Sequence, residues 1–333
     1  MFKEMKISVL ALLIFTACIC MPKLAEAAEE KQGMQNVSEE MRRAYREMIP
    51  LTGSADPVKE VRAIDIPADD PARKIPLKVY FPLTEKQEAA LPVFLFIHGG
   101  GFVSGDFDTH DVLARGIANG ASCIVVSVGY RLAPEHPFPS GLEDVYAALL
   151  WSRDNAADIG GDNAKIAVGG DSAGGNLAAA LSLIARDRKG PKISGQWLMY
   201  PTLGNKMDTD SWARLGDEYF PTREVNSAII SAYVPKGKDP YGPLVAPLWA
   251  ELENLPPTLI QAGGLDPLSD EGRDFVQKMK KSGGEATFLF YPEFQHGFIQ
   301  FYKDEKNFPG APAAFEQGLS WLREIYSRES ATK

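Results

Sequence analysis

The sequence has few cysteines. Three of its 333 residues are cysteine, and two of these, Cys18 and Cys20, lie close to the N-terminus. If that end is removed, Cys123 remains as a single thiol, and no internal disulfide can form. Cys123 opens the apolar run 123–126, so we expect it to be a small buried hydrophobic residue.

No long run of lysine and arginine stands out in the chain either. Its 35 basic and 44 acidic residues give a formal net charge of −9. Nucleic acids and anionic membrane surfaces attract clusters of basic residues. The composition therefore argues against a nucleic-acid partner and against electrostatic binding to a membrane.

The N-terminus carries a short apolar segment. Two lysines precede the apolar stretch 7–20, and a proline and a small-residue pattern at 25–27 follow it. This order is typical of a secretory signal peptide, residues 1–27, and the stretch is shorter than a permanent spanning helix needs. We therefore expect export to the periplasm or medium, without stable membrane insertion after processing. An uncleaved anchor and lipid attachment at Cys18 are the alternatives.

Apolar runs of strand length alternate with helical patterns along most of the chain. Such strands, separated by helices, are typical of a parallel sheet covered on both faces. We predict an α/β fold with a mostly parallel, eight-stranded sheet. The first two strands, 58–66 and 75–81, flank a turn sequence and form a hairpin-like pair. The other strands are predicted at 92–97, 123–128, 166–168, 197–200, 258–261 and 286–291, and the helices at 111–117, 141–151, 173–184, 271–280 and 313–326.

One stretch breaks this alternation. More than fifty residues separate the strands that end near Tyr200 and begin near Thr258, and they include a helical pattern at 222–233. Because this is too long for a simple crossover, we interpret it as a cap over the carboxyl ends of the strands. We expect it to pack with an N-terminal helix, 38–48, whose N-cap is Ser38. A structural layer remote from the site is the alternative.

A serine stands between glycines where a predicted strand meets a predicted helix. Residues 170–174 read Gly-Asp-Ser-Ala-Gly. The glycines let strand and helix approach closely, which leaves Ser172 exposed on a sharp turn. A serine hydroxyl is a good nucleophile only when a base removes its proton. This context predicts Ser172 as the nucleophile, with a glycine-rich turn and a capping serine as the alternative.

A glycine run follows the strand at 92–97. It reads His-Gly-Gly-Gly-Phe from His98 onward, and its backbone N–H groups can point into a cavity. We expect the N–H groups of Gly100, Gly101 and Ala173 to form an oxyanion hole, and His98 to orient the loop by hydrogen bonding. A phosphate-binding loop would need a Lys-Ser/Thr ending or G-x-G-x-x-G spacing, and neither is present.

The base and the acid follow the serine. Of the four histidines, only His296 comes after Ser172, so it is the base if the order is serine, acid, histidine. Asp266 lies just past a predicted strand, where a carboxylate can reach a histidine. Asp270 and Glu271 start a helix, where capping and the helix dipole explain them. We predict that Asp266 orients and stabilises His296.

Together these motifs resemble the hormone-sensitive-lipase-like (family IV) bacterial carboxylesterases of the α/β-hydrolase fold. The resemblance covers about 55–330, and the matching segments are 98–102, 130–135, 137–139, 170–175, 243–247, 266–268 and 296–298. It implies a serine carboxylesterase that hydrolyses short-chain acyl esters through an acyl-enzyme, with no cofactor and no metal. The implied organisation is a signal peptide (1–27), an N-terminal part of the cap (28–55), a catalytic domain (56–204 and 241–333) and a cap insertion (205–240).

The same three catalytic side chains serve other reactions. The alternatives are an amidase, an arylformamidase or a sugar deacetylase, and more remotely a non-catalytic binding protein of this fold. The expected partner is a small-molecule ester. Phe102, Trp212, Tyr219 and Phe220 are candidates for its pocket, with packing inside the cap as the alternative.

Overall fold

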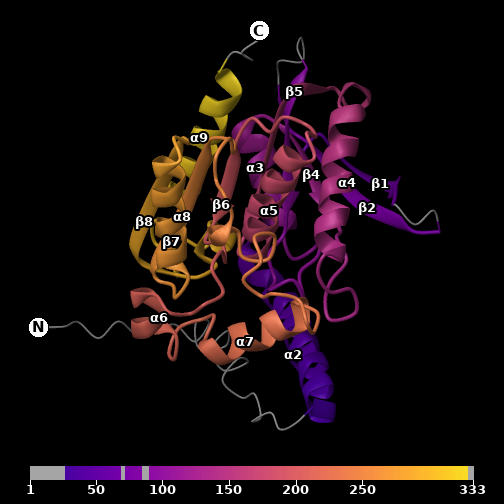
Figure 1. Cartoon of the computed structure of the whole chain (residues 1–333). Helices are drawn as coiled ribbons and strands as arrows, with labels where there is room; N and C mark the ends of the chain where they lie inside the picture. The colour runs from indigo at the N-terminus through magenta and orange to yellow at the C-terminus, as the bar shows by residue number, and fades with distance from the viewer. Residues whose placement is uncertain (1–26, 69–71, 85–89, 329–333) are drawn as a thin grey trace, which may run out of the picture.

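The computed structural model describes residues 27–68, 72–84 and 90–328. An eight-stranded sheet in the order β1-β2-β4-β3-β5-β6-β7-β8 runs through its centre (Figure 1). The pairs β1–β2 and β2–β4 are antiparallel, and the other neighbours are parallel. The predicted α/β fold with a mostly parallel sheet is therefore confirmed. The strands are β1 (Glu60–Pro67), β2 (Lys74–Phe81), β3 (Leu91–Ile97), β4 (Ile124–Val128), β5 (Gly161–Asp171), β6 (Gln196–Met199), β7 (Thr258–Leu265) and β8 (Ala286–Gln295).

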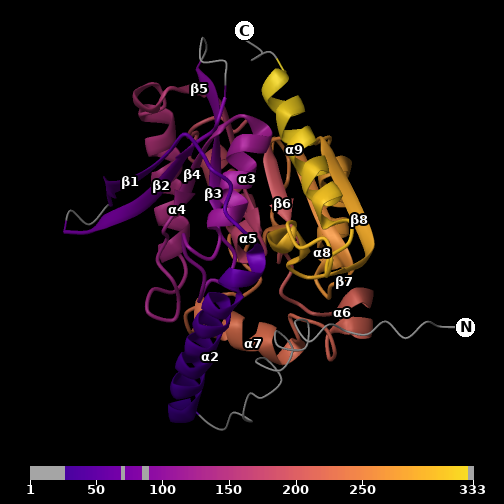
Figure 2. The ribbon, with the colours of Figure 1, turned by 180° about the vertical axis from the view of Figure 1, so that it is seen from behind.

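Helices cover both faces of the sheet. Helices α4 (Ser140–Asp154), α5 (Ala173–Asp187) and α8 (Ser269–Lys281) lie on the face seen in Figure 1, and α3 (Asp111–Ala121) and α9 (Ala311–Ser327) on the face seen in Figure 2. Short 3-10 helices lie at Ile49–Thr52, Ala157–Ile159, Pro247–Trp249 and Phe298–Phe301.

The central strand β3 divides the hydrophobic core between these two layers. Its side chains alternate between faces, as they do in any strand. Val93, Leu95 and Ile97 pack in the cluster that includes residues of α4, α5 and α8. Phe94 and Phe96 pack in the cluster with α3 and α9. Because both faces are buried, the strand is apolar throughout, which is why its position was readable from the sequence.

The N-terminal helix is longer than predicted. Helix α2 (Ala27–Met48) starts well before Ser38, which is a buried residue inside the helix and not its N-cap. Residues 27–32 are alanine, glutamate, lysine and glutamine, which are strong helix formers and extend the helix upstream. The apolar stretch 7–20 and Cys18 lie outside the described residues. Within the described ranges, no helix has both the length and the hydrophobicity needed to span a bilayer.

The strand that leads to the serine also starts earlier than predicted. Strand β5 begins at Gly161, which pairs with Leu91 of β3. The polar residues Asp162 and Asn163 interrupt the apolar pattern there, so the sequence alone indicated only the buried end of the strand. Cys123 is buried, as expected, directly before β4.

Three helices lie at the carboxyl ends of the strands. Helix α2 crosses this end next to α7 (Arg223–Tyr233), and α6 (Asp210–Leu215) lies beside β7 and α8 (Figures 1 and 2). Helix α7 matches the helical pattern read at 222–233, whereas α6 was not predicted. Arg42 attaches α2 to the body by donating to the carbonyl oxygens of Val103 at 2.8 Å and Ala133 at 3.1 Å.

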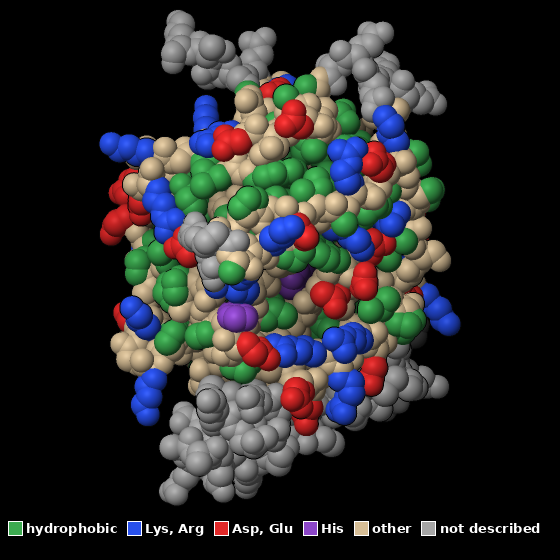
Figure 3. Space-filling view, turned by 90° about the vertical axis from the view of Figure 1, so that its right-hand side faces the viewer, with side chains coloured by type: hydrophobic (Ala, Val, Ile, Leu, Met, Phe, Trp, Pro, Cys, Tyr) green, Lys and Arg blue, Asp and Glu red, His purple; other side chains and the backbone are tan. Residues whose placement is uncertain are grey.

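The face that carries β1, β2 and α4 has a mixed surface. Figure 3 shows its basic and acidic side chains interspersed with apolar ones, without a continuous area of one charge among the described residues in view.

Candidate active site

Ser172 lies on a strained turn between β5 and α5. Its backbone has φ 53° and ψ −116°, a conformation that non-glycine residues rarely adopt. A Cβ atom added at Gly170 or Gly174 would overlap the carbonyl oxygen of Ile97 at the end of β3. The two glycines therefore allow β3, β5 and α5 to meet closely, and this meeting lifts Ser172 above the end of the sheet.

The register of β7 and β8 brings Asp266 and His296 together. These parallel strands pair Leu265 with Gln295, so the next residue on each strand leaves the sheet beside the other. Gly263 permits the close approach, because a Cβ there would overlap the carbonyl oxygen of Phe294.

The three side chains form one hydrogen-bonded chain. His296 Nδ1 lies 2.8 Å from Asp266 Oδ2, and His296 Nε2 lies 2.9 Å from Ser172 Oγ. The side chain of Asp266 is fully buried and that of His296 is 5% exposed. With Nδ1–H directed at the carboxylate, Nε2 is left to take a proton from the serine.

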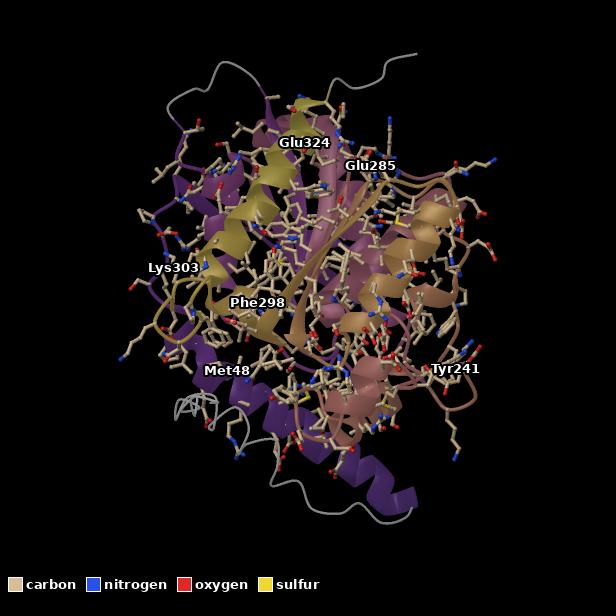
Figure 4. All side chains as sticks on the ribbon, turned by 90° about the vertical axis from the view of Figure 1, so that its left-hand side faces the viewer. Met48, Tyr241, Glu285, Phe298, Lys303 and Glu324 are labelled. Carbon is tan, nitrogen blue, oxygen red and sulfur yellow. The ribbon has the colours of Figure 1, made fainter. Side chains whose placement is uncertain are left out.

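Neighbouring contacts hold both side chains in place. The other oxygen of Asp266 accepts the backbone N–H of Leu268 at 2.9 Å. The ring of Tyr200 meets the His296 imidazole edge-on, with 5.0 Å between centroids. Phe298, two residues further on, lies inside the molecule near the end of β8 (Figure 4) and stacks on Phe294 at 4.5 Å. The segment that carries His296 is thus anchored on both sides.

The glycine run after β3 lies next to Ser172. Gly100 and Gly101 have φ 117° and 61°, which favour glycine. The backbone N–H groups of Gly100, Gly101 and Ala173 donate to no other described residue. They are donors available to a ligand, as an oxyanion hole requires.

A buried polar network fixes this glycine run from behind. Asp171 Oδ1 accepts the backbone N–H of Gly99 at 2.8 Å, and Asp171 Oδ2 lies 3.3 Å from His110 Nε2. Burial alone would raise the pKa of Asp171, but His110 and the Gly99 N–H hold it below its usual value. His98 Nδ1 lies 2.8 Å from the carbonyl oxygen of Gly99, and burial lowers the pKa of His98 to about 4. The roles of Asp171 and His110 were not predicted from the sequence, because Asp171 is 72 residues from Gly99 and 61 residues from His110 along the chain.

Asp171→Ala is expected to weaken both folding and catalysis. It leaves the Gly99 N–H and His110 without their buried partner, which costs about 3 kcal/mol of unfolding free energy. Displacing the adjacent donors should lower kcat by about 10- to 100-fold. Asp171→Asn, which keeps an oxygen for the Gly99 N–H, is the matched control and should lose much less of both. Denaturant unfolding and ester kinetics measure the two effects; wild-type values for Asp171→Ala would contradict this role.

Two of the four predicted pocket residues line the small cavity beside Ser172 and His296, and two do not. Phe102 and Phe220 belong to its walls. Trp212 is fully buried and donates from its indole N–H to Glu271 Oε1 at 2.9 Å, and Tyr219 is also not among the lining residues. The apolar walls of the cavity include Met41, Tyr45, Phe102, Phe220, Ile229 and Leu268.

Asp270 and Glu271 hold the start of the inserted segment and the residues just before it, a role that was not predicted from the sequence. Asp270 Oδ2 accepts the backbone N–H of Ser211 at 2.8 Å. Glu271 Oε2 accepts the N–H groups of Leu203 and Gly204, each at 2.7 Å. Burial raises the pKa of Glu271 above its usual value, although these donors favour the charged form. Neither carboxylate caps α8; both face the chain that leads into α6.

Comparison with known proteins supports the fold and indicates the family. Residues 94–300 match the family model described as alpha/beta hydrolase fold. The carboxylesterase NlhH of Mycobacterium tuberculosis is 41% identical over 75% of this chain and 78% of its own length. An arylesterase of Saccharolobus solfataricus is 36% identical over 74% of this chain and 79% of its own.

A solved structure has the same fold. The hyperthermophilic esterase from the archaeon Pyrobaculum calidifontis superposes with a TM-score of 0.82 at 33% identity, covering 96% of this chain and 98% of that one. The family match, these relatives and the α/β architecture together confirm the resemblance read from the motifs. The chain therefore belongs to the hormone-sensitive-lipase-like carboxylic ester hydrolases of the α/β-hydrolase fold.

Proposed function

We propose that this carboxylesterase hydrolyses short-chain acyl esters with the triad Ser172, His296 and Asp266, through an acyl-enzyme. One observation carries the proposal: the three side chains, from three separate loops, join in a chain of hydrogen bonds of 2.8 and 2.9 Å. The strained turn at Ser172 and the unbonded N–H groups beside it add support.

The first half of the reaction transfers the acyl group to the enzyme. Ser172 Oγ attacks the ester carbonyl carbon as its proton passes to His296 Nε2. The carbonyl oxygen becomes negative and is held by the N–H groups of Gly100, Gly101 and Ala173. The bond to the alcohol oxygen then breaks, and His296 gives its proton to the leaving alcohol.

The second half regenerates the enzyme. Water attacks the acyl carbon and gives a proton to His296, and the same N–H groups hold the oxyanion again. When the bond to Ser172 Oγ breaks, His296 returns the proton to the serine, and the acid leaves. Asp266 stays ionised throughout and stabilises the imidazolium that forms twice in each cycle.

The segments at the carboxyl ends of the strands are proposed to form the cap. These are the N-terminal part, 28–55, and the insertion, 205–240, with α2 and α7 in contact. Met41 and Ile229 line the cavity from these two helices, so the cap is proposed to limit substrate size. We further propose that the protein is exported, on the charge and hydrophobicity pattern of its first 27 residues.

A chain-length series tests this proposal. The cavity beside Ser172 has a volume of about 20 Å³, so a long acyl chain would have to displace α2 or α7. Among p-nitrophenyl esters, we expect kcat/KM to be highest for acetate and butanoate and to fall at least about 100-fold by dodecanoate, because the free-energy cost of displacing a helix outweighs the gain from burying the added methylenes. Equal or higher values for dodecanoate would contradict the proposal.

A second panel tests the type of bond that is cleaved. Acetanilide, N-formylkynurenine and acetylated xylose represent the amidase, arylformamidase and deacetylase reactions of the same triad. Each should be hydrolysed more slowly than p-nitrophenyl acetate. A higher kcat/KM for any of these three substrates than for p-nitrophenyl acetate would mean that the corresponding reaction, and not short-chain ester hydrolysis, is the preferred one.

A further inference from the structure

The cavity beside Ser172 contains two polar side chains among its apolar walls. Asn226 on α7 is 3% exposed, and Thr202, in the loop after β6, is 6% exposed. Both line the same cavity as Ser172 and His296. Asn226 Nδ2 and Thr202 Oγ1 are buried, and neither has a hydrogen-bond partner among the described residues. Buried polar atoms are nearly always paired, so these two invite a partner from a ligand.

The backbone around both residues is well fixed. Asn176 on α5 donates to the carbonyl oxygen of Thr202 at 2.8 Å. Helix α7 is capped by the side chain of Thr222, and Arg223 attaches its first turn by donating to the carbonyl oxygens of Met207 and Trp212, each at 2.7 Å. The backbone positions that carry the two unpartnered atoms are therefore fixed before any ligand arrives, which reduces the entropy cost of binding.

The chemistry of the cavity selects a neutral, oxygen-bearing group. An amide N–H needs an acceptor, and a threonine hydroxyl can donate to one. Among the described residues, the titratable side chains that line the cavity are His296 and Tyr45. A carboxylate arm beyond the reach of His296 would therefore be buried without a counter-charge. A volume of about 20 Å³ is close to the space that one water-sized group needs. An ether, hydroxyl or second carbonyl oxygen meets these conditions.

We propose that Asn226 and Thr202 form a polar subsite for a neutral oxygen in one arm of the ester substrate. The preferred substrates are then esters with an additional hydrogen-bond-accepting oxygen a few bonds from the scissile carbonyl. This inference rests on the proposed function, because it concerns the substrate that Ser172 attacks.

Pairs of esters that differ only in CH₂ against O test the subsite. For the acyl arm the pair is p-nitrophenyl methoxyacetate and p-nitrophenyl butanoate; for the alcohol arm it is 2-methoxyethyl acetate and butyl acetate. The measured quantity is the ratio of kcat/KM for the oxygen-containing ester to that for its hydrocarbon partner. Comparing this ratio between enzyme variants removes the intrinsic difference in reactivity.

Asn226→Leu and Thr202→Val remove the polar atoms while keeping similar side-chain volumes. In each variant, the ratio for one of the two pairs should fall about five- to tenfold, the loss of one neutral hydrogen bond, and the responding pair identifies the arm. Ile229→Leu, which changes an apolar wall of the same cavity on the same helix, is the matched control and should keep the wild-type ratios. Thr202→Val lies on a different element, so it still tests the subsite if Asn226→Leu does not fold.

The outcomes separate this inference from the proposed function. If both Asn226→Leu and Thr202→Val are active and keep the wild-type ratios for both pairs of esters, the subsite proposal is wrong and the proposed function still stands. A drop of the same size in Ile229→Leu would also overturn it, because any change of the wall would then suffice. If the wild-type enzyme hydrolysed none of the four esters, or hydrolysed them no faster than the Ser172→Ala variant, the proposed function would fail, and the subsite with it.

Discussion

Ser172→Ala is expected to lower kcat for p-nitrophenyl acetate by a factor on the order of 10⁶. The substitution removes the only atom that can form the acyl-enzyme, while the oxyanion donors and the cavity remain and leave a small residual rate. The Ser172 hydroxyl bonds to His296 and makes no capping bond to α5. The free energy of unfolding should therefore stay within about 0.5 kcal/mol of the wild-type value.

Ser182→Ala is the matched control for this variant. Ser182 lies within α5, the helix that Ser172 precedes, and it is buried, but its hydroxyl bonds to Ala178 and Gln196, away from the site. It should keep ester hydrolysis. Initial rates and thermal unfolding of the two variants test whether Ser172 is the nucleophile. A folded Ser172→Ala enzyme that retains more than a trace of activity would show that another group performs the attack.

Asp266→Asn is expected to lower kcat by about 10⁴-fold with little change in the fold. Asparagine has nearly the shape of aspartate, but its amide favours the wrong imidazole tautomer and cannot stabilise the imidazolium. The effect is large because Asp266 is fully buried 2.8 Å from His296 Nδ1 and is not screened by solvent.

A nearby carboxylate provides the control. Asp270 is 5% exposed and accepts a backbone N–H from Ser211, which Asp270→Asn can still do. That variant should keep catalysis, so the two substitutions separate the acid of the triad from a structural carboxylate four residues away. A loss of kcat in Asp270→Asn as large as in Asp266→Asn would reverse the assignment.

The fold was predictable because its strands are buried on both faces. Strand β3 is continuously apolar. Around Ser172, the sequence pattern changes from that of a strand to that of a helix at a serine flanked by glycines. Asp266 was identified by its place just past a predicted strand, and His296 as the one histidine that follows Ser172 in the sequence. Such signals are local, so they can be read from a single sequence.

The parts that could not be predicted depend on contacts between distant segments. Trp212 is an aromatic residue in the insertion and was a reasonable pocket candidate, yet it pairs with Glu271 in a buried contact that no local pattern indicates. The link from Asp171 to Gly99 and His110 is of the same kind. Asn226 and Thr202 come to the cavity only because α7 and the loop after β6 meet there. Hydrophobic periodicity indicates which face of a helix or strand is buried, but it does not indicate which residues that face contacts.

Covalent labelling tests the central claim most directly. Diethyl p-nitrophenyl phosphate transfers its phosphoryl group to an activated serine and releases p-nitrophenol. Peptide mass spectrometry of the inactivated enzyme should find one adduct, on Ser172, in proportion to the activity lost, and His296→Ala should be labelled far more slowly. Inactivation with an unmodified Ser172, or with the adduct on another residue, would contradict the account.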